Sequence, residues 1–385
     1  MIEERTEILC IGNALVDVFV CLDEQTANRL GITEPVQHVE IQKLREILDE
    51  LPGKSNTACP QGNVSLMGIS SGGGAANVAK IAAFLGTKAG FLGAVGRYPE
   101  GGTGQNEKAD EYGQLFEKEL GAAGVQLGLA LKKPPTGICL FLKTGEGKTC
   151  IATALSAALE FSEADIDGED IQKAKVVVID GFMLDRGGIV YQILNLADKS
   201  GTVAVLDLSS VPIAREHAAE ILGYSRRYSL ILFMNEAEAE AFYDELEAQG
   251  LGLNDEGGEE DSKPFFSPLT AEQRNAESHL RRSCSFFQSL TKRDIFPIIV
   301  VKLGKRGAIC FAGGAIYRAG TLELIPHDSI GAGDTFCAAF LSAWIKNKSL
   351  LECTALGNKA ARIILGVTGT LANKKQFAGV ARQLK

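Results

Sequence analysis

Residues 328–336 read DSIGAGDTF, and this stretch decides how the rest of the chain is interpreted. Its small residues Gly331, Ala332 and Gly333 have no bulky side chains, so their backbone amides can closely approach a ligand. The apolar run TFCAAFLSAWI that follows Asp334 predicts a buried helix beginning near Gly333. The start of a helix offers unpaired N–H groups and the positive end of the helix dipole, and together these predict an anion pocket.

Asp334 directly follows the small residues, and a carboxylate beside an anion pocket is unfavourable unless it takes part in a reaction. Removing a proton from a substrate hydroxyl, while the amides hold a transferring phosphoryl group, is such a reaction. The alternative is an aspartate that caps a helix after a Gly-rich turn. The GAGD sequence alone does not separate these two interpretations.

The rest of the chain predicts a doubly wound α/β fold. Short apolar runs, each suited to a strand covered on both faces of a parallel sheet, alternate with helical patterns. Six of these runs are EILCIG, KAGFLGAVG, KVVVIDG, TVAVLDLS, LILFMN and PIIVVKLG. We therefore expect a single domain over residues 1–385.

Two regions depart from this alternation. Residues 16–22 and the runs TGICLFLKT and KTCIATA resemble antiparallel strands. We expect them to form a small separate sheet, with lid segments at about residues 14–40 and 130–155, that serves as a lid or a dimer contact; an extra layer of core is the alternative. The acidic, Gly-rich run at residues 255–261 indicates a partly disordered surface insertion over about residues 250–290.

Composition and charge narrow the function. A formal net charge of −9 argues against binding to nucleic acid or an anionic membrane, because both need a basic face. No apolar run approaches the roughly 18 residues of a membrane helix. The N-terminal stretch is charged, unlike a secretory leader, and the nine cysteines include no C-x-x-C pair, so we expect a cytoplasmic protein.

The pattern D-S-x-G-A-G-D-x-F resembles the C-terminal motif of the PfkB/ribokinase family of sugar and nucleoside kinases. A second stretch, GGGAANVAKIAAFLGTKAGFLGAVG at residues 72–96, resembles the other long motif of that family and lies in the expected order. The shorter matches GNALVD, NEAE, VKLGKRGA and GNKAARIILGVTGT extend the resemblance over nearly the whole chain. The resemblance implies a ribokinase-like sheet flanked by helices, a small β-sheet lid, and phosphoryl transfer from ATP to a hydroxyl of a sugar or nucleoside.

The resemblance also implies roles for individual residues. The catalytic group would comprise the general base Asp334 and the anion hole Gly331, Ala332 and Gly333. The acceptor would be bound by Asn13, Asp17, Gly73, Gly74 and Asn77. The nucleotide would be bound by Asn235, Lys302, Gly304, Gly307 and Asn358. Mg²⁺ would be organised by Glu238, and a monovalent cation such as K⁺ would lie beside Asp328.

Several alternatives stay open at this stage. Asn235 followed three residues later by Glu238 is also the pattern of a helix capping box. The GGGAAN stretch and the region around TGICLFLKT resemble adenosine-kinase-like members and favour a nucleoside or ribofuranoside acceptor. A fructokinase- or ribokinase-type sugar kinase, a non-catalytic sensor with the same fold, an ADP-dependent kinase and a homodimer formed through the lid remain as alternatives.

Overall fold

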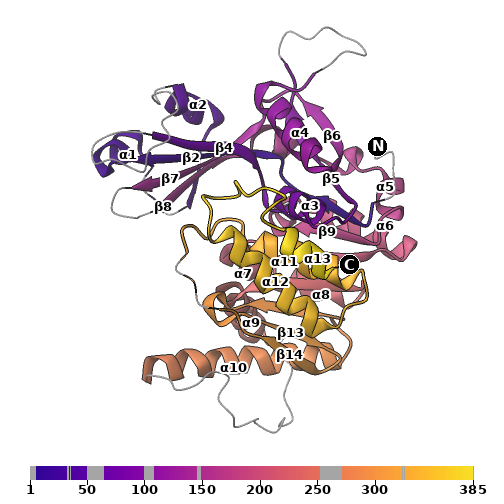
Figure 1. The fold of residues 1–385 in the computed structure, drawn as a ribbon. Helices are drawn as coiled ribbons and strands as arrows, with labels where there is room; N and C mark the ends of the chain where they lie inside the picture. The colour runs from indigo at the N-terminus through magenta and orange to yellow at the C-terminus, as the bar shows by residue number, and fades with distance from the viewer. Residues whose placement is uncertain are drawn as a thin grey trace.

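The computed structural model describes residues 6–32, 34, 36–49, 65–98, 108–144, 149–251, 271–322, 324 and 326–384. These residues form one nine-stranded and one five-stranded sheet. The small sheet projects away from the large one, and helices cover the large sheet on both faces (Figure 1). Among these residues, no helix is long and apolar enough to cross a membrane.

The large sheet has the order β14-β13-β12-β11-β10-β9-β1-β5-β6. Its strands from β6 to β12 run parallel, and β13 and β14 add an antiparallel edge. All six apolar runs predicted to be strands lie in this sheet, which confirms the doubly wound fold. The strands are β1 (Ile8–Ile11), β5 (Ala89–Gly96), β6 (Gln126–Lys132), β9 (Val176–Asp180), β10 (Val203–Asp207), β11 (Leu230–Asn235), β12 (Ile299–Lys302), β13 (Ala308–Ala312) and β14 (Ala315–Ala319).

Two hydrophobic cores form, one on each face of the large sheet, because its strands point apolar residues to both sides. One face is covered by α5 (Gly168–Gln172), α6 (Gly188–Ser200), α7 (Val211–Glu216), α8 (Ala218–Ser225), α9 (Glu236–Ala248) and α10 (Ala271–Lys292). The other is covered by α3 (Gly74–Phe84), α4 (Glu111–Ala123), α11 (Ala332–Trp344), α12 (Leu350–Ile364) and α13 (Ala378–Gln383). Helix α11 packs between α3 and α12, so both long sequence motifs come together.

The small sheet has the order β3-β8-β7-β2-β4. The predicted antiparallel pairing of β7 with β8 is confirmed, and β2 has an antiparallel partner in β4; β2 also pairs with β7, and the parallel direction of these two strands was not predicted. The reason is that β2 and β7 each follow a strand of the large sheet, β1 and β6, and leave it in the same direction. The elements are β2 (Leu15–Leu22), α1 (Glu24–Leu30), β3 (Val36–His38), α2 (Ile41–Asp49), β4 (Ser65–Gly72), β7 (Gly137–Thr144) and β8 (Thr149–Ala154).

The acidic run at residues 255–261, expected to be a surface insertion, lies outside the described residues. The later part of that region is helix α10, which packs against α9 and β13. Its residues Leu280, Cys284, Phe287 and Leu290 are buried in the core. From Leu280 onward, this helix therefore packs into the domain core.

Candidate functional site

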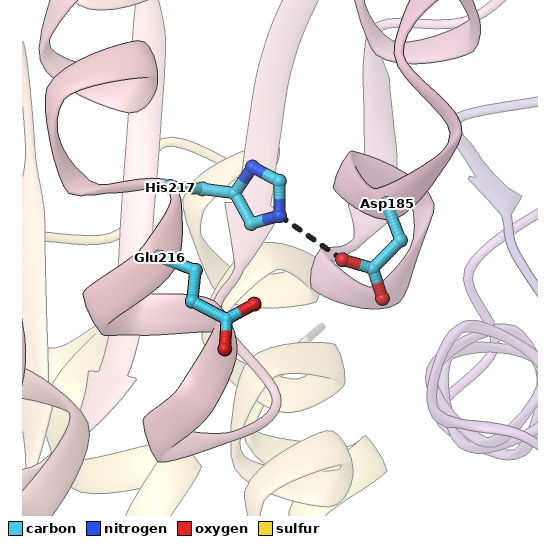
Figure 2. Close-up of side chains that lie close together, drawn as sticks. All are labelled: Asp185, Glu216 and His217. Carbon is cyan, nitrogen blue, oxygen red and sulfur yellow. Dashed lines mark hydrogen bonds and ion pairs between the residues drawn. The ribbon is translucent and has the colours of Figure 1, made fainter.

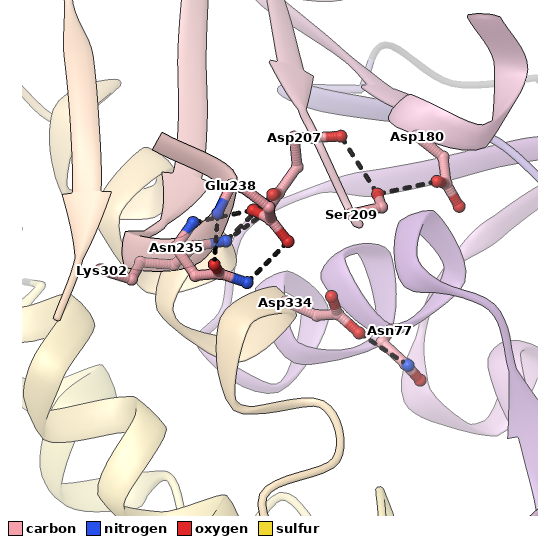
Figure 3. Close-up of polar contacts among 8 residues, drawn as sticks. All are labelled: Asn77, Asp180, Asp207, Ser209, Asn235, Glu238, Lys302 and Asp334. Carbon is pink, nitrogen blue, oxygen red and sulfur yellow. Dashed lines mark hydrogen bonds and ion pairs between the residues drawn. The ribbon is translucent and has the colours of Figure 1, made fainter. Parts of the chain in front are cut away.

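Polar side chains gather where the parallel strands of the large sheet end. Asp180 and Asp207 are paired at the ends of β9 and β10, and Asn235 and Lys302 are paired at the ends of β11 and β12. Since parallel strands end at the same edge of a sheet, these four residues lie along one rim. Figure 3 shows them facing the start of α11, which carries Asp334.

Helix α11 begins at Ala332, as the sequence predicts to within one residue, and Gly331 precedes it with φ +75°. A Cβ on Gly331 would lie only 2.6 Å from Thr370 Cγ2, so glycine is needed there. A Cβ on Gly333 would lie 3.2 Å from the Nζ of Lys302. The helix start therefore places an ammonium group beside the amides of Gly331 and Gly333, an arrangement that suits an anion, whereas the Ala332 N–H already donates to the carbonyl oxygen of Ser329 at 3.3 Å.

Asp334 lies in the first turn of α11 and pairs with a residue from the other long motif. Asn77 Nδ2 donates a hydrogen bond of 2.9 Å to Asp334 Oδ2. Burial raises the pKa of Asp334 to about 7, with the negative charge of Asp207 adding to the effect and the Asn77 hydrogen bond opposing it. A carboxylate with a pKa near neutrality is suited to accept a proton.

Asn77 has a further property that bears on ligand binding. Its Oδ1 atom is buried and has no hydrogen-bond partner among the described residues. A buried polar atom without a partner is costly, so such atoms mark places where a ligand or water completes the site. A hydroxyl group placed beside Asn77 would satisfy this atom.

Asp17 enters the site from strand β2 of the small sheet and is only 3% exposed. Its carboxyl group occupies the space above Gly72, where a Cβ would lie 2.0 Å from Asp17 Oδ1. Burial raises the pKa of Asp17 to about 8, opposed by the charge of Lys80 and reinforced by Asp334 and Glu119. No hydrogen bond to this carboxyl group occurs within the described part of the chain.

The glycines at the start of α3 have no side chains, and this leaves space for a neighbouring backbone carbonyl group and for two carboxylates. Gly73 has φ +97°, and a Cβ there would lie 2.1 Å from the carbonyl oxygen of Asn13. A Cβ on Gly74 would lie 3.4 Å from Asp180 Oδ2 and 3.6 Å from Asp334 Oδ1. The chain at Gly74 thus passes between two carboxylates, and the space above it is small and polar.

Two residues near the predicted Asn13 and Gly74, namely Arg186 and Asp180, were not predicted. Asn13 is buried, and its Oδ1 accepts a hydrogen bond from Arg186, which also donates to the carbonyl oxygen of Ala158 at 2.6 Å. Asp180 accepts hydrogen bonds from Phe182 N at 3.1 Å and from Ser209 Oγ at 3.0 Å. The position of Asp180 at the end of the run KVVVIDG was a usable signal, whereas nothing in the local sequence marks Arg186.

On the other side of Asp334, the predicted pair Asn235 and Glu238 forms a capping box for α9. Asn235 Oδ1 accepts the backbone N–H of Glu238 at 2.9 Å, and Glu238 accepts both the backbone N–H of Asn235 at 2.7 Å and its side-chain amide at 2.6 Å. Burial raises the pKa of Glu238 to about 7, although Lys302 opposes the shift. The structural interpretation of this pair is therefore confirmed, and any role towards a metal is additional to it.

Lys302 is paired with Asp207, a residue that sequence reasoning missed. Lys302 Nζ donates to both carboxylate oxygens of Asp207, at 2.9 and 2.8 Å. Burial alone would lower the pKa of Lys302, but Asp207 and Glu238 raise it above the usual value for lysine. The ammonium group beside the start of α11 is therefore charged.

The remaining residues expected near the nucleotide differ in how closely other parts of the protein already pack against them. Gly304 has φ +55°, and the space where its Cβ would lie is open. Gly307 is required by packing, because a Cβ there would lie 2.1 Å from the carbonyl oxygen of Ala319. Asn358 Nδ2 donates to the same oxygen at 2.7 Å and ties α12 to β14. Only Gly304 of these three offers free space to a ligand.

Asp328 connects two loops near the site. It accepts the backbone N–H of Ile330 at 3.0 Å and that of Gly369 at 2.9 Å, so it joins the loop before α11 to the loop after α12. A cavity of about 360 Å³ lies beside it, between this loop and the small sheet. Phe19 and Phe141 line the cavity as a stacked pair with ring centroids 5.0 Å apart.

A separate group of metal-ligating types lies between η3 (Gly181–Arg186) and α8, and consists of Asp185, Glu216 and His217 (Figure 2). His217 already contacts two carboxylates, through Nε2 to Asp185 at 3.0 Å and through Nδ1 to Glu220 at 2.8 Å. Burial opposes its protonation, but these carboxylates raise the pKa of His217. An imidazole held between the carboxylates of Asp185 and Glu220 accounts for this cluster as a structural contact between η3 and α8.

Comparison with known proteins agrees with this geometry. The model of the pfkB family carbohydrate kinases matches residues 48–257 and 286–376, and the chain belongs to this family. It is therefore a phosphotransferase that acts on an alcohol group of a sugar or nucleoside.

The individual relatives are distant. The chain is 24% identical to adenosine kinase 1 of Arabidopsis thaliana, over 96% of this chain and 97% of the relative. The structure of adenosine kinase from Sinorhizobium meliloti is similar with a TM-score of 0.73 and 24% identity, covering 99% of this chain and 100% of that one. A probable sugar kinase from Rhizobium etli CFN 42 is similar with a TM-score of 0.74 and 22% identity, over 99% and 100% of the two chains.

Proposed function

We propose that this kinase transfers the γ-phosphoryl group of ATP to a hydroxyl of a ribofuranoside, with a nucleoside such as adenosine as the favoured acceptor and Asp334 as the general base. The observation that carries this proposal is the hydrogen-bonded pair of Asn77 and Asp334 at the open start of α11. The pair brings together a proton acceptor with a pKa of about 7, an unpaired acceptor atom on Asn77 and an anion pocket.

The steps follow from these groups. The acceptor hydroxyl lies against Asp334, which takes its proton as the oxygen attacks the γ-phosphorus; the bond from that phosphorus to the bridging oxygen breaks, and ADP leaves. Asp17 and Asn77 hold neighbouring hydroxyls and so fix which oxygen faces Asp334. The amides of Gly331 and Gly333 and the ammonium of Lys302 stabilise the charge on the transferring group, and the Ala332 N–H would share its hydrogen bond to the carbonyl oxygen of Ser329 with that group.

The residues around the anion pocket fit a magnesium nucleotide. The open space at Gly304 leaves room for the nucleotide, and the side chain of Lys302 is held toward α11 by Asp207. Both oxygens of Glu238 already accept hydrogen bonds from Asn235, so Glu238 would act on Mg²⁺ through bound water. Mg²⁺ would neutralise part of the negative charge of the phosphates. Asn358 would support the adenine pocket indirectly, because its amide is engaged with Ala319.

The nucleoside preference is supported by the adenosine kinases of Arabidopsis thaliana and Sinorhizobium meliloti, which this chain resembles over nearly its whole length. The stacked Phe19 and Phe141 rings beside the cavity offer an aromatic surface suited to a nucleobase. The comparably similar probable sugar kinase from Rhizobium etli CFN 42 supports a free sugar as the second candidate acceptor.

The test is ADP release from Mg-ATP with adenosine, guanosine, inosine, ribose or fructose as acceptor, with and without K⁺, and with ADP as an alternative donor. We expect turnover with a nucleoside, loss of turnover in Asp334→Asn, and AMP as the product when adenosine is the acceptor. Turnover with fructose or ribose alone would favour the sugar-kinase candidate. A protein that binds ATP and adenosine but turns over no acceptor would contradict the proposal.

A further inference from the structure

Lys80 is a buried lysine in the middle of α3, one turn after Asn77, and it is only 6% exposed. A buried ammonium group is costly unless it is paired. Its Nζ lies 3.3 Å from Ser71 Oγ and 3.8 Å from Glu119 Oε2. The direct partners of Lys80 are therefore a hydroxyl and a carboxylate at the long end of ion-pair distance.

Glu119 is itself engaged with strand β4. Its Oε2 accepts the backbone N–H of Ser71 at 2.8 Å and the Ser71 hydroxyl at 3.0 Å. The carboxylate is thus fixed in place by the strand rather than by Lys80. Lys80 and Glu119 are thus not in a close ion pair, and the ammonium group of Lys80 can also attract another nearby negative charge.

Asp17 is that other group. It pairs with Ser70 across β2 and β4, and its carboxyl group lies over Gly72. Burial lowers the pKa of Lys80, whereas Glu119 and Asp17 raise it again. Lys80 and Glu119 both contact Ser71, and the Asp17 carboxyl group lies over the next residue, Gly72, so the end of β4 brings one buried ammonium group and two carboxylates together.

Other elements contribute titratable groups around Asp17. Helix α11 contributes Asp334, whose negative charge disfavours ionisation of Asp17. Strand β7 contributes Cys139, a buried thiol whose pKa is raised by burial and by Asp17. Among these groups, Lys80 supplies the positive charge that favours the ionised form of Asp17.

We propose that Lys80 and Glu119 are positioning residues for the acceptor: together they set the charge on Asp17, and thereby the strength and pH dependence of acceptor binding. The proposal rests on the assignment of Asp17 to the acceptor. An ionised Asp17 accepts hydrogen bonds from two hydroxyls with both oxygens, whereas a protonated carboxyl group offers fewer acceptor sites. Acceptor affinity should therefore increase as pH rises through the ionisation of Asp17.

The test uses two substitutions that should shift the pH dependence of adenosine binding in opposite directions. Lys80→Met removes the positive charge, so the rise in adenosine affinity moves to higher pH. Glu119→Gln removes the competing negative charge, so the rise moves to lower pH. Because a neighbouring charge shifts a carboxyl pKa by roughly 1–3 units, Lys80→Met should weaken adenosine binding at least about tenfold at neutral pH. Glu119→Gln should strengthen it there.

The measurement is the Kd of adenosine by calorimetry across the neutral to alkaline range. Equilibrium binding keeps the proton transfer at Asp334 out of the signal. Lys80→Arg is the matched control that keeps the charge, and it should retain the wild-type midpoint. Asp17→Asn should remove the part of the pH dependence that belongs to Asp17. If Lys80→Met and Glu119→Gln weaken binding equally at every pH, both residues only hold the fold and the proposal is wrong.

A second measurement separates this proposal from the proposed function. The Asp17 carboxyl resonance, assigned by its loss in Asp17→Asn, is titrated by ¹³C NMR in the free protein, in which no acceptor is needed. Opposite shifts in Lys80→Met and Glu119→Gln would support the electrostatic role even if adenosine failed to bind, which would overturn only the nucleoside assignment. An unchanged Asp17 titration in both variants would overturn the role of Lys80.

Discussion

The buried polar and charged groups on the two sides of Asp334 differ in how far they are paired within the protein. On the side that the proposed function assigns to the phosphates (the phosphate side), Asp207 contacts Lys302 directly, and the capping box occupies Glu238. On the side that it assigns to the acceptor (the acceptor side), Asp17 has no hydrogen bond to its carboxyl group within the described residues, and Asn77 Oδ1 is unpaired. Under this proposal, the side that would bind the charged ligand holds its own ion pair, whereas the side that would bind neutral hydroxyls keeps polar atoms that the acceptor would complete.

The substitution Asp334→Asn should have the largest effect. It tests whether Asp334, which lies between the two sides, is the group that accepts the proton. Loss of a general base costs about 10²–10⁴ in rate, so kcat should fall by that factor. The amide is nearly the same size, so the Kd values of adenosine and ATP should change only a few-fold. Steady-state kinetics and calorimetry on the same preparation provide the check. A kcat within a few-fold of wild type would show that the base lies elsewhere.

Breaking the ion pair on the phosphate side should mainly affect stability. Lys302→Met leaves Asp207 buried beside Asp180 and Asp334 without its partner, and loss of one partner of a buried pair costs about 3–5 kcal/mol. Urea unfolding should show this loss, and ATP affinity should also fall. The double variant Lys302→Met with Asp207→Asn should recover part of the stability, since it leaves no uncompensated charge. No recovery in the double variant would contradict direct coupling of the two residues.

Stability should depend on pH through the buried acids on both sides of Asp334, since the pKa of Glu238 is raised as well. The pKa values of Asp17 and Asp334 are raised in the folded protein, to about 8 and about 7, so the folded state binds more protons than the unfolded state between the ordinary aspartate pKa and these values. The free energy of unfolding should therefore decrease as pH rises from about 4 towards 7 and 8. Asp17→Asn should flatten this dependence in chemical denaturation, and an unchanged slope would contradict the raised pKa.

The smallest expected effect is that of Asn358→Ala. This change removes the hydrogen bond to Ala319 and leaves a buried carbonyl oxygen without that donor, which costs about 1–3 kcal/mol of unfolding free energy. Because the amide is directed to the protein backbone, the KM for ATP should change little in thermally stable samples. A large rise in that KM with unchanged stability would instead place Asn358 in contact with the nucleotide.

Much of the fold could be predicted because parallel strands in a covered sheet are apolar on both faces, as the runs KVVVIDG and LILFMN show. The start of α11 could be predicted for a similar reason, since DSIGAGDTF combines turn residues with a buried helix. The parallel pairing of β2 with β7 was not predicted, because strand direction depends on how each segment leaves the large sheet.

The partners of the site residues were harder to predict. Asp207 ends an apolar run and could have been found by its position, but its bond to Lys302 joins residues far apart in the sequence. The cluster of Lys80, Ser71 and Glu119 comes from three elements, and each residue is unremarkable in its own local sequence. Such contacts depend on tertiary packing, which hydrophobic periodicity does not encode.

The measurement that tests the central claim most directly is the single-turnover rate of phosphoryl transfer to adenosine as a function of pH, with both ligands saturating. The base must be deprotonated to act, so the rate should rise with pH through about 7, the pKa of Asp334, and then level off. In Asp334→Asn the remaining rate should be low and lack this rise. A wild-type rate that does not change with pH, or the same rise in the variant, would contradict the assignment of Asp334 as the base.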